Sequence, residues 1–257
     1  MRPNKIKRVL QRGETVFGTM IGDIRMPAIG NILAEAGFDF MFIDMEHGPY
    51  DIEDVDTLCR VARLAGITPL VRVPDAEYFL LARPLDAGAQ GLMIPRVRTR
   101  EQVEFIIRST KYPPMGERGC SLLKGHSDYH VEPVKDFVRQ ANEENMVILQ
   151  IELKEAVEHI DELLSVPGVD VALIGPNDLS LSLGIPDEFS NPLLEASIQK
   201  VVDSCQRHGV VAGMHIGNLD ILRHWMKKGM RMITWSSPLH MMMSAARAGL
   251  QTLRQPL

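Results

Sequence analysis

Short apolar segments alternate with longer amphipathic ones along almost the whole sequence. The predicted strands are Thr15–Gly22, Phe38–Met45, Thr68–Pro74, Ala89–Val97, Met146–Leu153, Val169–Gly175, Val210–Gly217 and Met230–Ser236. Between them, runs such as Ile52–Leu64, Ala76–Leu85 and Leu193–Arg207 carry apolar residues at three- and four-residue spacing, which is typical of helices. Repeated strand–helix units produce parallel strands joined by right-handed crossovers. Eight such units in 257 residues predict an α/β fold, a single (β/α)8 TIM barrel.

Glycine often stands just before a predicted strand, where the preceding helix should end. The positions are Gly37, Gly66, Gly88, Gly168, Gly209 and Gly229. Glycine is the usual residue past a helix end because it adopts the left-handed conformation easily. An open doubly wound sheet is the alternative architecture, but the sequence lacks Gly-x-Gly-x-x-Gly. No domain boundary is visible, so we expect one domain over residues 1–257.

Composition argues against several classes of partner. The net charge is −5, and no stretch combines clustered Lys and Arg with aromatic residues, so we expect no nucleic-acid binding. The three cysteines, Cys59, Cys120 and Cys205, are too far apart for a disulfide framework or a zinc motif. No apolar run has the length of a signal peptide or a membrane span. We therefore expect a cytoplasmic protein without a membrane partner.

One segment, Tyr112–His130, interrupts the alternation. It contains two prolines, three glycines and several polar residues, and it is too long for an ordinary connection. Because it follows the fourth strand–helix unit, we expect it to fold over the top of the barrel or to reach a neighbouring subunit. A disordered surface loop is the alternative.

Charged side chains gather where two of the predicted strands end. Asp44, Glu46 and His47 follow the second strand, and Arg72 lies on the third. Catalytic side chains of TIM barrels come from the C-terminal strand ends, so this pattern indicates an active site. Taken alone, the first group could equally be an acidic turn with a solvated histidine. Arg72 inside a barrel needs an anionic or carbonyl partner, and a salt bridge to Glu46 or Glu152 is the structural alternative.

The fifth and sixth strands contribute a second polar group. Gln150 and Glu152 are two residues apart and therefore share one face of their strand. A carboxylate inside the barrel is costly unless it is paired or bound to a metal. Asn177 and Asp178 lie in a strand-to-helix turn whose amides suit a small anion, although Asp178 could be a plain helix cap. Glu152 and Asp178, completed by water and substrate, suit a magnesium- or manganese-type site.

Several short motifs in a fixed order resemble those of one enzyme family. They are Ile43-Asp44-Met45-Glu46-His47, Val71-Arg72-Val73-Pro74, Leu85-Asp86-Ala87-Gly88-Ala89-Gln90, Tyr112-Pro113-Pro114 with Gly116 and Arg118-Gly119, Gln150-Ile151-Glu152, and Ile174-Gly175-Pro176-Asn177-Asp178-Leu179-Ser180. Together they cover roughly residues 15–250. On these motifs the sequence resembles the HpcH/HpaI aldolase family, the metal-dependent class II pyruvate aldolases.

The resemblance implies a reaction. Enzymes of this family reversibly cleave 4-hydroxy-2-oxo acids to pyruvate and an aldehyde through a metal-stabilised pyruvate enolate. By position, Glu152 and Asp178 would hold a divalent metal, Mg²⁺, Mn²⁺ or Co²⁺. Arg72 would stabilise the enolate oxygen, and His47 would be the general base, acting through a water.

The resemblance also implies supporting roles around the metal. Asp44 and Glu46 would lie beside the metal-bound waters, and Gln150 would lie beside the keto group. The backbone amides of Asn177 and Asp178 would bind the pyruvate carboxylate.

The resemblance further implies a homo-hexamer with an exchanged C-terminal helix, here about residues 239–253. Asp86 matches an acidic residue that orients the histidine in the family. It precedes the fourth predicted strand, however, and so lies at the wrong end of its own barrel. We therefore expect it to serve only a neighbouring subunit's site.

Aldehyde specificity and two other functions stay open. We expect the acceptor aldehyde to meet the Pro113–His130 loop, since the pyruvate end is already filled. Departures from the family, such as Met45 for a usual glycine, leave the aldehyde unidentified. One alternative function is a lyase of the citrate-lyase β-chain type acting on acyl thioesters, for which Lys124 and His126 are the only hint. The other is a catalytically idle barrel that binds an oxo acid.

Overall fold

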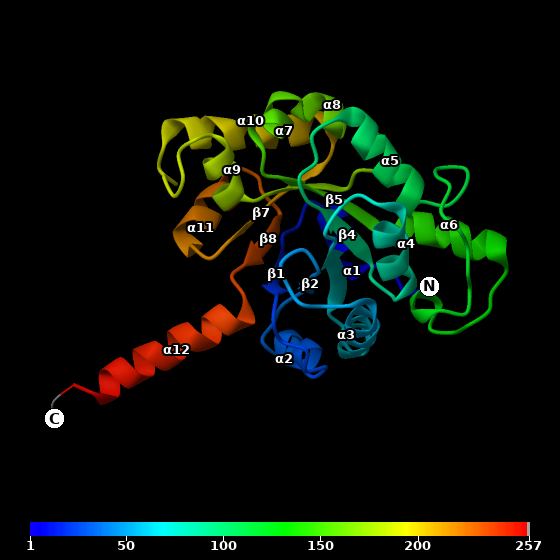
Figure 1. Ribbon diagram of the computed structural model, residues 1–257, viewed down its shortest axis with the longest axis horizontal. Helices are drawn as coiled ribbons and strands as arrows, with labels where there is room; N and C mark the ends of the chain where they lie inside the picture. The colour runs from blue at the N-terminus through cyan, green and yellow to red at the C-terminus, as the bar shows by residue number, and fades with distance from the viewer. Residues whose placement is uncertain (256–257) are drawn as a thin grey trace.

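The strands form one closed barrel in chain order, with β1 paired to both β2 and β8 (Figure 1). This computed structural model describes residues 1–255. The strands are β1 Val16–Ile21, β2 Phe40–Asp44, β3 Thr68–Arg72, β4 Gly91–Ile94, β5 Met146–Ile151, β6 Val171–Ile174, β7 Val211–Ile216 and β8 Met232–Trp235. All neighbouring pairs are parallel. The predicted (β/α)8 TIM barrel is confirmed.

Helices surround the barrel and cover its outer face (Figure 1). They are α1 Lys5–Gln11, α2 Ile29–Glu35, α3 Ile52–Ala65, α4 Tyr78–Asp86, α5 Arg100–Thr110, α6 Val134–Glu144, α7 Lys154–Glu158, α8 Ile160–Leu164, α9 Pro176–Ser182, α10 Pro192–His208, α11 Leu219–Lys227 and α12 Pro238–Leu253. Helix α3 begins with a reciprocal capping box between Asp51 and Asp54 and ends at Gly66, where φ is +84°. All six glycines predicted to follow helices have positive φ.

The strands are shorter than predicted because the backbone turns before the apolar residues end. The fourth strand ends at Ile94, since Arg96 adopts φ +52° and cannot continue an extended chain. Ser236, with φ +54°, follows the end of β8 in the same way. Apolar character in the sequence continues past these turns because the strand-end loops are themselves buried.

Two apolar cores explain why the strands are apolar on both faces. The inner core fills the barrel with side chains such as Phe40, Phe42 and Ile148, and Ile6 of α1 packs against it. The outer core lies between the strands and the helices. Gly18 is required in the inner core, because a Cβ there would lie 2.3 Å from the Phe40 ring. Residues of alternate register therefore face the lumen, and at the strand ends these positions become polar.

The segment between α5 and α6 lies at the N-terminal end of the barrel. Arg118 pairs with Asp86 at the end of α4 at 2.5 Å, and Arg63 near the end of α3 donates to the carbonyl of Gly125 at 2.7 Å. Both helices run back from the C-terminal to the N-terminal end of the strands, so their last turns mark the lower end. The expectation that this segment folds over the top of its own barrel is therefore wrong. Within one subunit this segment also cannot meet the aldehyde at the C-terminal end of the strands. The prediction that it contacts the aldehyde is therefore wrong for a single subunit.

Helix α12 projects away from the barrel (Figure 1). None of its described residues is buried, and the large apolar side chains of Met242, Met243, Leu250 and Leu253 are exposed. In the part of the chain that the structure describes, no helix combines the length and hydropathy required to cross a bilayer.

Candidate active site

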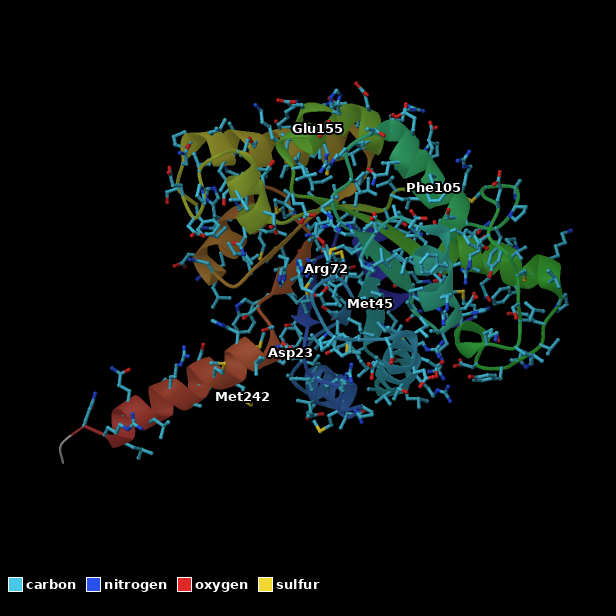
Figure 2. The ribbon with its side chains drawn as sticks, in the orientation of Figure 1. Asp23, Met45, Arg72, Phe105, Glu155 and Met242 are labelled. Atoms are coloured by element: carbon cyan, nitrogen blue, oxygen red, sulfur yellow. The ribbon has the colours of Figure 1, made fainter. Side chains whose placement is uncertain are left out.

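Polar lumen-facing side chains meet at the C-terminal end of the barrel, which we call the mouth. Figure 2 shows Arg72 within the ring of strands. The polar residues come from β2, β3, β5 and its end, and β7, and they are Asp44, Arg72, Gln150, Glu152 and His215. Of these, His215 is partly buried and the others are at most 7% exposed. The structure thus brings these four predicted residues together, places a fifth predicted residue, Glu46, beside Arg72, and adds a histidine.

Arg72 is held in a fixed orientation by two carboxylates. Its Nε donates to Oδ1 of Asp44 at 2.7 Å and its Nη2 donates to Oδ2 of Asp44 at 2.6 Å. Its Nη1 lies 3.2 Å from Oε2 of Glu46. Burial opposes ionisation of Asp44, but Arg72 and the amides of His47 and Glu46 together lower the pKa of its carboxyl. The buried guanidinium is therefore charged, oriented and close to the lumen.

Glu152 is a buried carboxylate in electrostatically unfavourable surroundings. Burial raises its pKa to about 7, the hydrogen bond from the Arg96 amide opposes this rise, and Glu46 and Asp178 add to it. The Arg96 amide donates to Oε1 at 2.8 Å, and Nε2 of Gln150 donates to Oε2. Among residues 1–255, Oε1 of Gln150 is buried and has no hydrogen-bond partner. Neighbouring carboxylates of this kind are stabilised by a cation, so these oxygen donors suit a divalent metal.

Asn177 and Asp178 lie in the first turn of α9, which begins at Pro176. Amides in a first turn have no acceptor within their helix, so they can bind an anion or water. Asp178 is exposed, and it is close enough to Glu152 to raise the pKa of that carboxyl. Among residues 1–255 there is no group of three or more His, Cys, Asp or Glu placed to hold a metal ion. The metal prediction thus relies on two protein carboxylates, with water and substrate completing the coordination.

His47 and Asp86 lie outside the lumen. The His47 side chain is 69% exposed at the rim, with Nε2 4.0 Å from Oε2 of Glu46. Asp86 lies at the opposite end of the barrel and pairs with Arg118, as its place before the fourth strand predicted. Asp86 therefore takes no part in the mouth of its own subunit.

Sequence reasoning missed Arg96. Its strained backbone points its amide at Glu152, and Nη2 of its guanidinium donates to the Pro74 carbonyl at 2.9 Å and lies 3.6 Å from Oε1 of Glu46. A charged residue directly after an apolar strand and a proline was the available signal. Its φ of +52° could not be predicted, because only the surrounding contacts impose it.

Sequence reasoning also missed His215, near the end of β7. It borders a cavity of about 130 Å³ together with Met20, Asp23, Asp44 and Ser237. Burial lowers its pKa to about 4, the charge of Arg72 lowers it further, and the Thr234 backbone and Asp44 oppose this. Its imidazole is therefore neutral at physiological pH. The sequence did contain a signal for His215. It lies two residues after Gly213 on an otherwise apolar strand, so both residues point to the same face.

The low pKa of His215 predicts an acid-dependent loss of stability. The unfolded histidine titrates near 6.5 and the folded one near 4, so above pH 6.5 both states are neutral and nothing is lost. Between these values only the unfolded state binds the proton, so stability falls as pH falls. Urea unfolding measures the free energy of unfolding at about pH 7.5 and about pH 5. The decrease between these two pH values should be about 2 kcal/mol smaller in His215→Leu than in the unmodified protein. Equal losses in both proteins would contradict a buried neutral imidazole.

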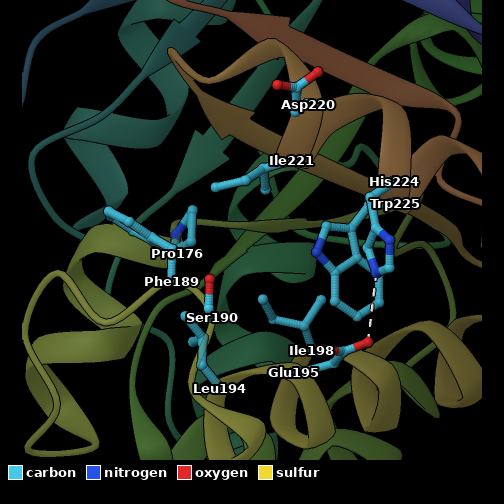
Figure 3. A pocket seen from close by; sticks show the side chains of 10 residues that line it. All are labelled: Pro176, Phe189, Ser190, Leu194, Glu195, Ile198, Asp220, Ile221, His224 and Trp225. Carbon is cyan, nitrogen blue, oxygen red and sulfur yellow. Dashed lines mark ion pairs between the residues drawn. The ribbon is translucent and has the colours of Figure 1, made fainter.

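A second cavity, of about 300 Å³, lies outside the barrel between α10 and α11 (Figure 3). Its wall contains Phe189, Ile198 and Trp225, and an ion pair joins His224 to Glu195 at 3.4 Å. These ionisable groups are exposed. Buried ionisable groups with displaced pKa values meet at the mouth instead, which makes the mouth the candidate active site.

An oriented arginine and clustered carboxylates at the C-terminal strand ends are typical of the enzymes among TIM-barrel proteins. The family model for HpcH/HpaI aldolase/citrate lyase matches residues 24–245, and the chain belongs to this family. With its curated relatives, this makes the protein a class II pyruvate aldolase, a carbon–carbon lyase.

Relatives of this chain are similar over nearly their whole length. A hydroxypyruvate/pyruvate aldolase of Paraburkholderia phytofirmans is 31% identical, with 98% of each chain covered. A 2-dehydro-3,6-dideoxy-6-sulfogluconate aldolase of Pseudomonas putida is 34% identical, with 96% of this chain and 95% of the relative covered. The crystal structure of an HpcH/HpaI aldolase from Desulfitobacterium hafniense is 34% identical with a TM-score of 0.94, covering 98% of this chain and 97% of that one.

Proposed function

We propose that the mouth of the barrel is the active site of a divalent-metal-dependent aldolase that cleaves 4-hydroxy-2-oxo acids to pyruvate and an aldehyde. The observation that carries the assignment is the oriented Arg72 beside the buried, partly uncharged Glu152. The test is a retro-aldol assay after chelation, with Mg²⁺, Mn²⁺ or Co²⁺ added back. Restoration by a metal supports the proposal, and full activity after exhaustive chelation contradicts it.

Glu152 and Asp178 are the proposed metal ligands. When bound, the cation would act as a Lewis acid on the oxo acid. Glu152 is held in place by the Arg96 amide and by Gln150, which limits the reorganisation needed on binding. Asp44 and Glu46 lie on the same side of the lumen and, as we propose, hydrogen-bond the surrounding waters.

Arg72 is the proposed oxyanion donor. Asp44 occupies Nε and Nη2, so the part of the guanidinium nearest Glu46 is the part that can turn to a substrate oxygen. A fixed donor stabilises negative charge that develops on the keto oxygen as the enolate forms. Gln150, with its unpartnered Oε1, would lie beside the keto group. The amides of Asn177 and Asp178 would bind the carboxylate.

His47 is the proposed general base. Its exposed imidazole lies at the rim, with Nε2 4.0 Å from Oε2 of Glu46. In cleavage it would accept the proton of the 4-hydroxyl through a water while the C3–C4 bond breaks. Electrons from that bond enter the enolate, which is then protonated at C3.

Replacing Arg72 by Lys should slow both proton exchange at the pyruvate methyl and retro-aldol cleavage by about 10²–10³. Lysine keeps the charge but cannot hold Asp44 through two parallel hydrogen bonds, so the donor loses its orientation. Exchange can be followed by NMR in heavy water, and cleavage by coupling pyruvate to a reporter dehydrogenase. Near-normal rates in both assays would reduce Arg72 to a structural salt bridge.

The other two candidate functions have less support. An acyl-thioester lyase needs a basic surface near the mouth, but Lys124 and His126 lie at the opposite end, with Nδ1 of His126 3.1 Å from the Asp86 carbonyl. The curated relatives named above are aldolases. An idle oxo-acid-binding barrel would not require a base or a pair of metal ligands. Among substrates, the donors named for relatives are pyruvate and hydroxypyruvate, and we propose pyruvate as the minimal donor here.

We also propose a homo-oligomer, a hexamer with α12 exchanged between subunits. The exposed methionines of α12 and the absence of any buried residue among its described residues support this. Asp86, remote from its own mouth, would then act on a neighbouring subunit's His47. A cytoplasmic location stays a prediction from the sequence.

A further inference from the structure

A cavity of about 390 Å³ lies at the N-terminal end of the barrel, opposite the mouth. Among the residues around it, Thr68 begins β3 and Gln90 directly precedes β4. Helix α1 closes this end of the barrel, since its Ile6 packs in the inner core. We call this space the basic cavity. Its volume falls within the range of about 300–1,000 Å³ that is usual for small-molecule sites.

The basic cavity has an excess of positive charge. None of its lining residues is acidic, and four are cationic, namely Arg2, Lys5, Arg8 and Arg63. Two carboxylates pair with this group from outside the lining. Asp128 lies 2.6 Å from Arg2 and 3.3 Å from Arg63, and Glu144 lies 2.5 Å from Arg8. Within residues 1–255 no carboxylate pairs with Lys5, so four positive charges face two negative ones.

Arg63 is a buried cation whose hydrogen bonds are incomplete. Its side chain is 4% exposed, with Nη1 donating to the Gly125 carbonyl at 2.7 Å and Nη2 3.3 Å from Asp128. In the part of the chain that the structure describes, its Nε is buried without a hydrogen-bond partner. Burial lowers the pKa of the guanidinium, Asp128 opposes this, and Arg2 lowers it further. A desolvated donor among other cations is stabilised by an anion.

Lys5 and Arg8 are placed to complete such a site. They are three residues apart on α1 and therefore share one face of the helix. Nζ of Lys5 is held only by the Gly66 carbonyl at 3.3 Å among the described residues, and the Arg8 side chain is 54% exposed. Nη1 of Arg2 donates to the Arg63 carbonyl at 2.9 Å, which fixes the start of the chain against the end of α3.

We propose that the basic cavity binds a phosphate dianion, free or as the monoester of a small metabolite, through Lys5, Arg8 and Arg63. A phosphate group supplies nearly two negative charges and several strong acceptor oxygens, which match the two uncompensated positive charges. Arginine binds phosphate oxygens through its planar fork, and lysine binds them as a point charge. Because the cavity lies at the end of the barrel opposite the mouth, the inference does not depend on the proposed function.

The test uses inorganic phosphate, and glycerol 3-phosphate as a monoester, titrated calorimetrically into the full chain. KCl at equal ionic strength controls for general screening. Each subunit should bind one phosphate group, and phosphate at ten times its Kd should raise the midpoint of thermal unfolding by about 2–5 °C. KCl should not. Tighter binding of glycerol 3-phosphate would identify a monoester as the ligand, and weaker binding would identify free phosphate.

Substitutions assign the binding to the cavity. Lys5→Gln should weaken phosphate binding about three- to tenfold and Arg63→Gln at least tenfold, since the second removes a buried charged donor. If Arg63→Gln does not fold, as circular dichroism would show, Lys5→Gln and Arg8→Gln decide the question. Lys227→Gln is the matched control, because Lys227 is exposed on α11 and does not line the cavity. It should leave the affinity unchanged.

Three results would overturn the inference. They are no binding of either probe, an equal thermal shift with KCl, and binding that Lys5→Gln and Arg8→Gln leave unchanged. The last would place the anion elsewhere, for instance at the amides of Asn177 and Asp178. Retro-aldol activity without phosphate should be the same in Lys5→Gln and the unmodified protein. Failure of phosphate binding is therefore distinguishable from failure of the proposed aldolase function.

Discussion

Glu152→Gln should abolish saturable binding of Mn²⁺ and lower retro-aldol activity by about 10⁴ or more, while the barrel still folds. The loss should exceed the 10²–10³ typical of one oxyanion donor, because metal ligation and substrate binding fail together. Glutamine has the same shape and can still accept from the Arg96 amide through its one carbonyl oxygen, but its NH2 group cannot accept from Nε2 of Gln150 and it supplies no negative oxygen. Calorimetry or electron paramagnetic resonance with Mn²⁺ measures binding directly, and circular dichroism reports folding.

The matched control is Glu155→Gln. Glu155 lies on α7, is exposed, and its carboxylate lies 3.8 Å from the Arg98 guanidinium (Figure 2). This change should leave metal affinity and activity within about twofold, since exposed ion pairs contribute little. Asp178→Asn should resemble Glu152→Gln. Undiminished Mn²⁺ affinity in both site variants would move the metal away from these carboxylates.

His47→Ala should lower aldol cleavage by about 10²–10⁴, the usual loss for a general base. Because the base acts on the 4-hydroxyl, proton exchange at the pyruvate methyl should fall much less, and extra metal should not restore cleavage. The ratio of the two rates therefore separates His47 from Arg72, whose replacement should slow both. The measurement is the same pair of NMR and coupled assays.

His130→Ala serves as the control for this variant, since His130 is also exposed but lies in the segment at the other end of the barrel. It should behave as the unmodified enzyme does. If His47→Ala lost exchange and cleavage equally, the imidazole would belong to enolate formation. If it lost neither, the base would be a different group at the rim.

The fold could be predicted from local patterns. A strand apolar on both faces must be covered on both faces, and eight such strands alternating with amphipathic helices leave a closed barrel as the simplest solution. Polar residues at the strand ends, such as Asp44, Arg72 and Glu152, were also recognisable, because charges directly after buried strands require partners. Asp86 was correctly placed at the far end because it precedes its strand.

Contacts between distant segments decided the rest. Which carboxylate would hold Arg72 depended on the register of β2 and β3, where Asp44 and Arg72 are paired. The route of the segment after α5 depended on Arg118 meeting Asp86, a contact no local pattern encodes. His215 and Thr234 became a pair only because β7 and β8 align them. Periodicity, helix caps and strand ends depend on interactions over a few residues and can therefore be recognised in the sequence. Strand register and loop docking depend on free-energy differences summed over the whole packed barrel.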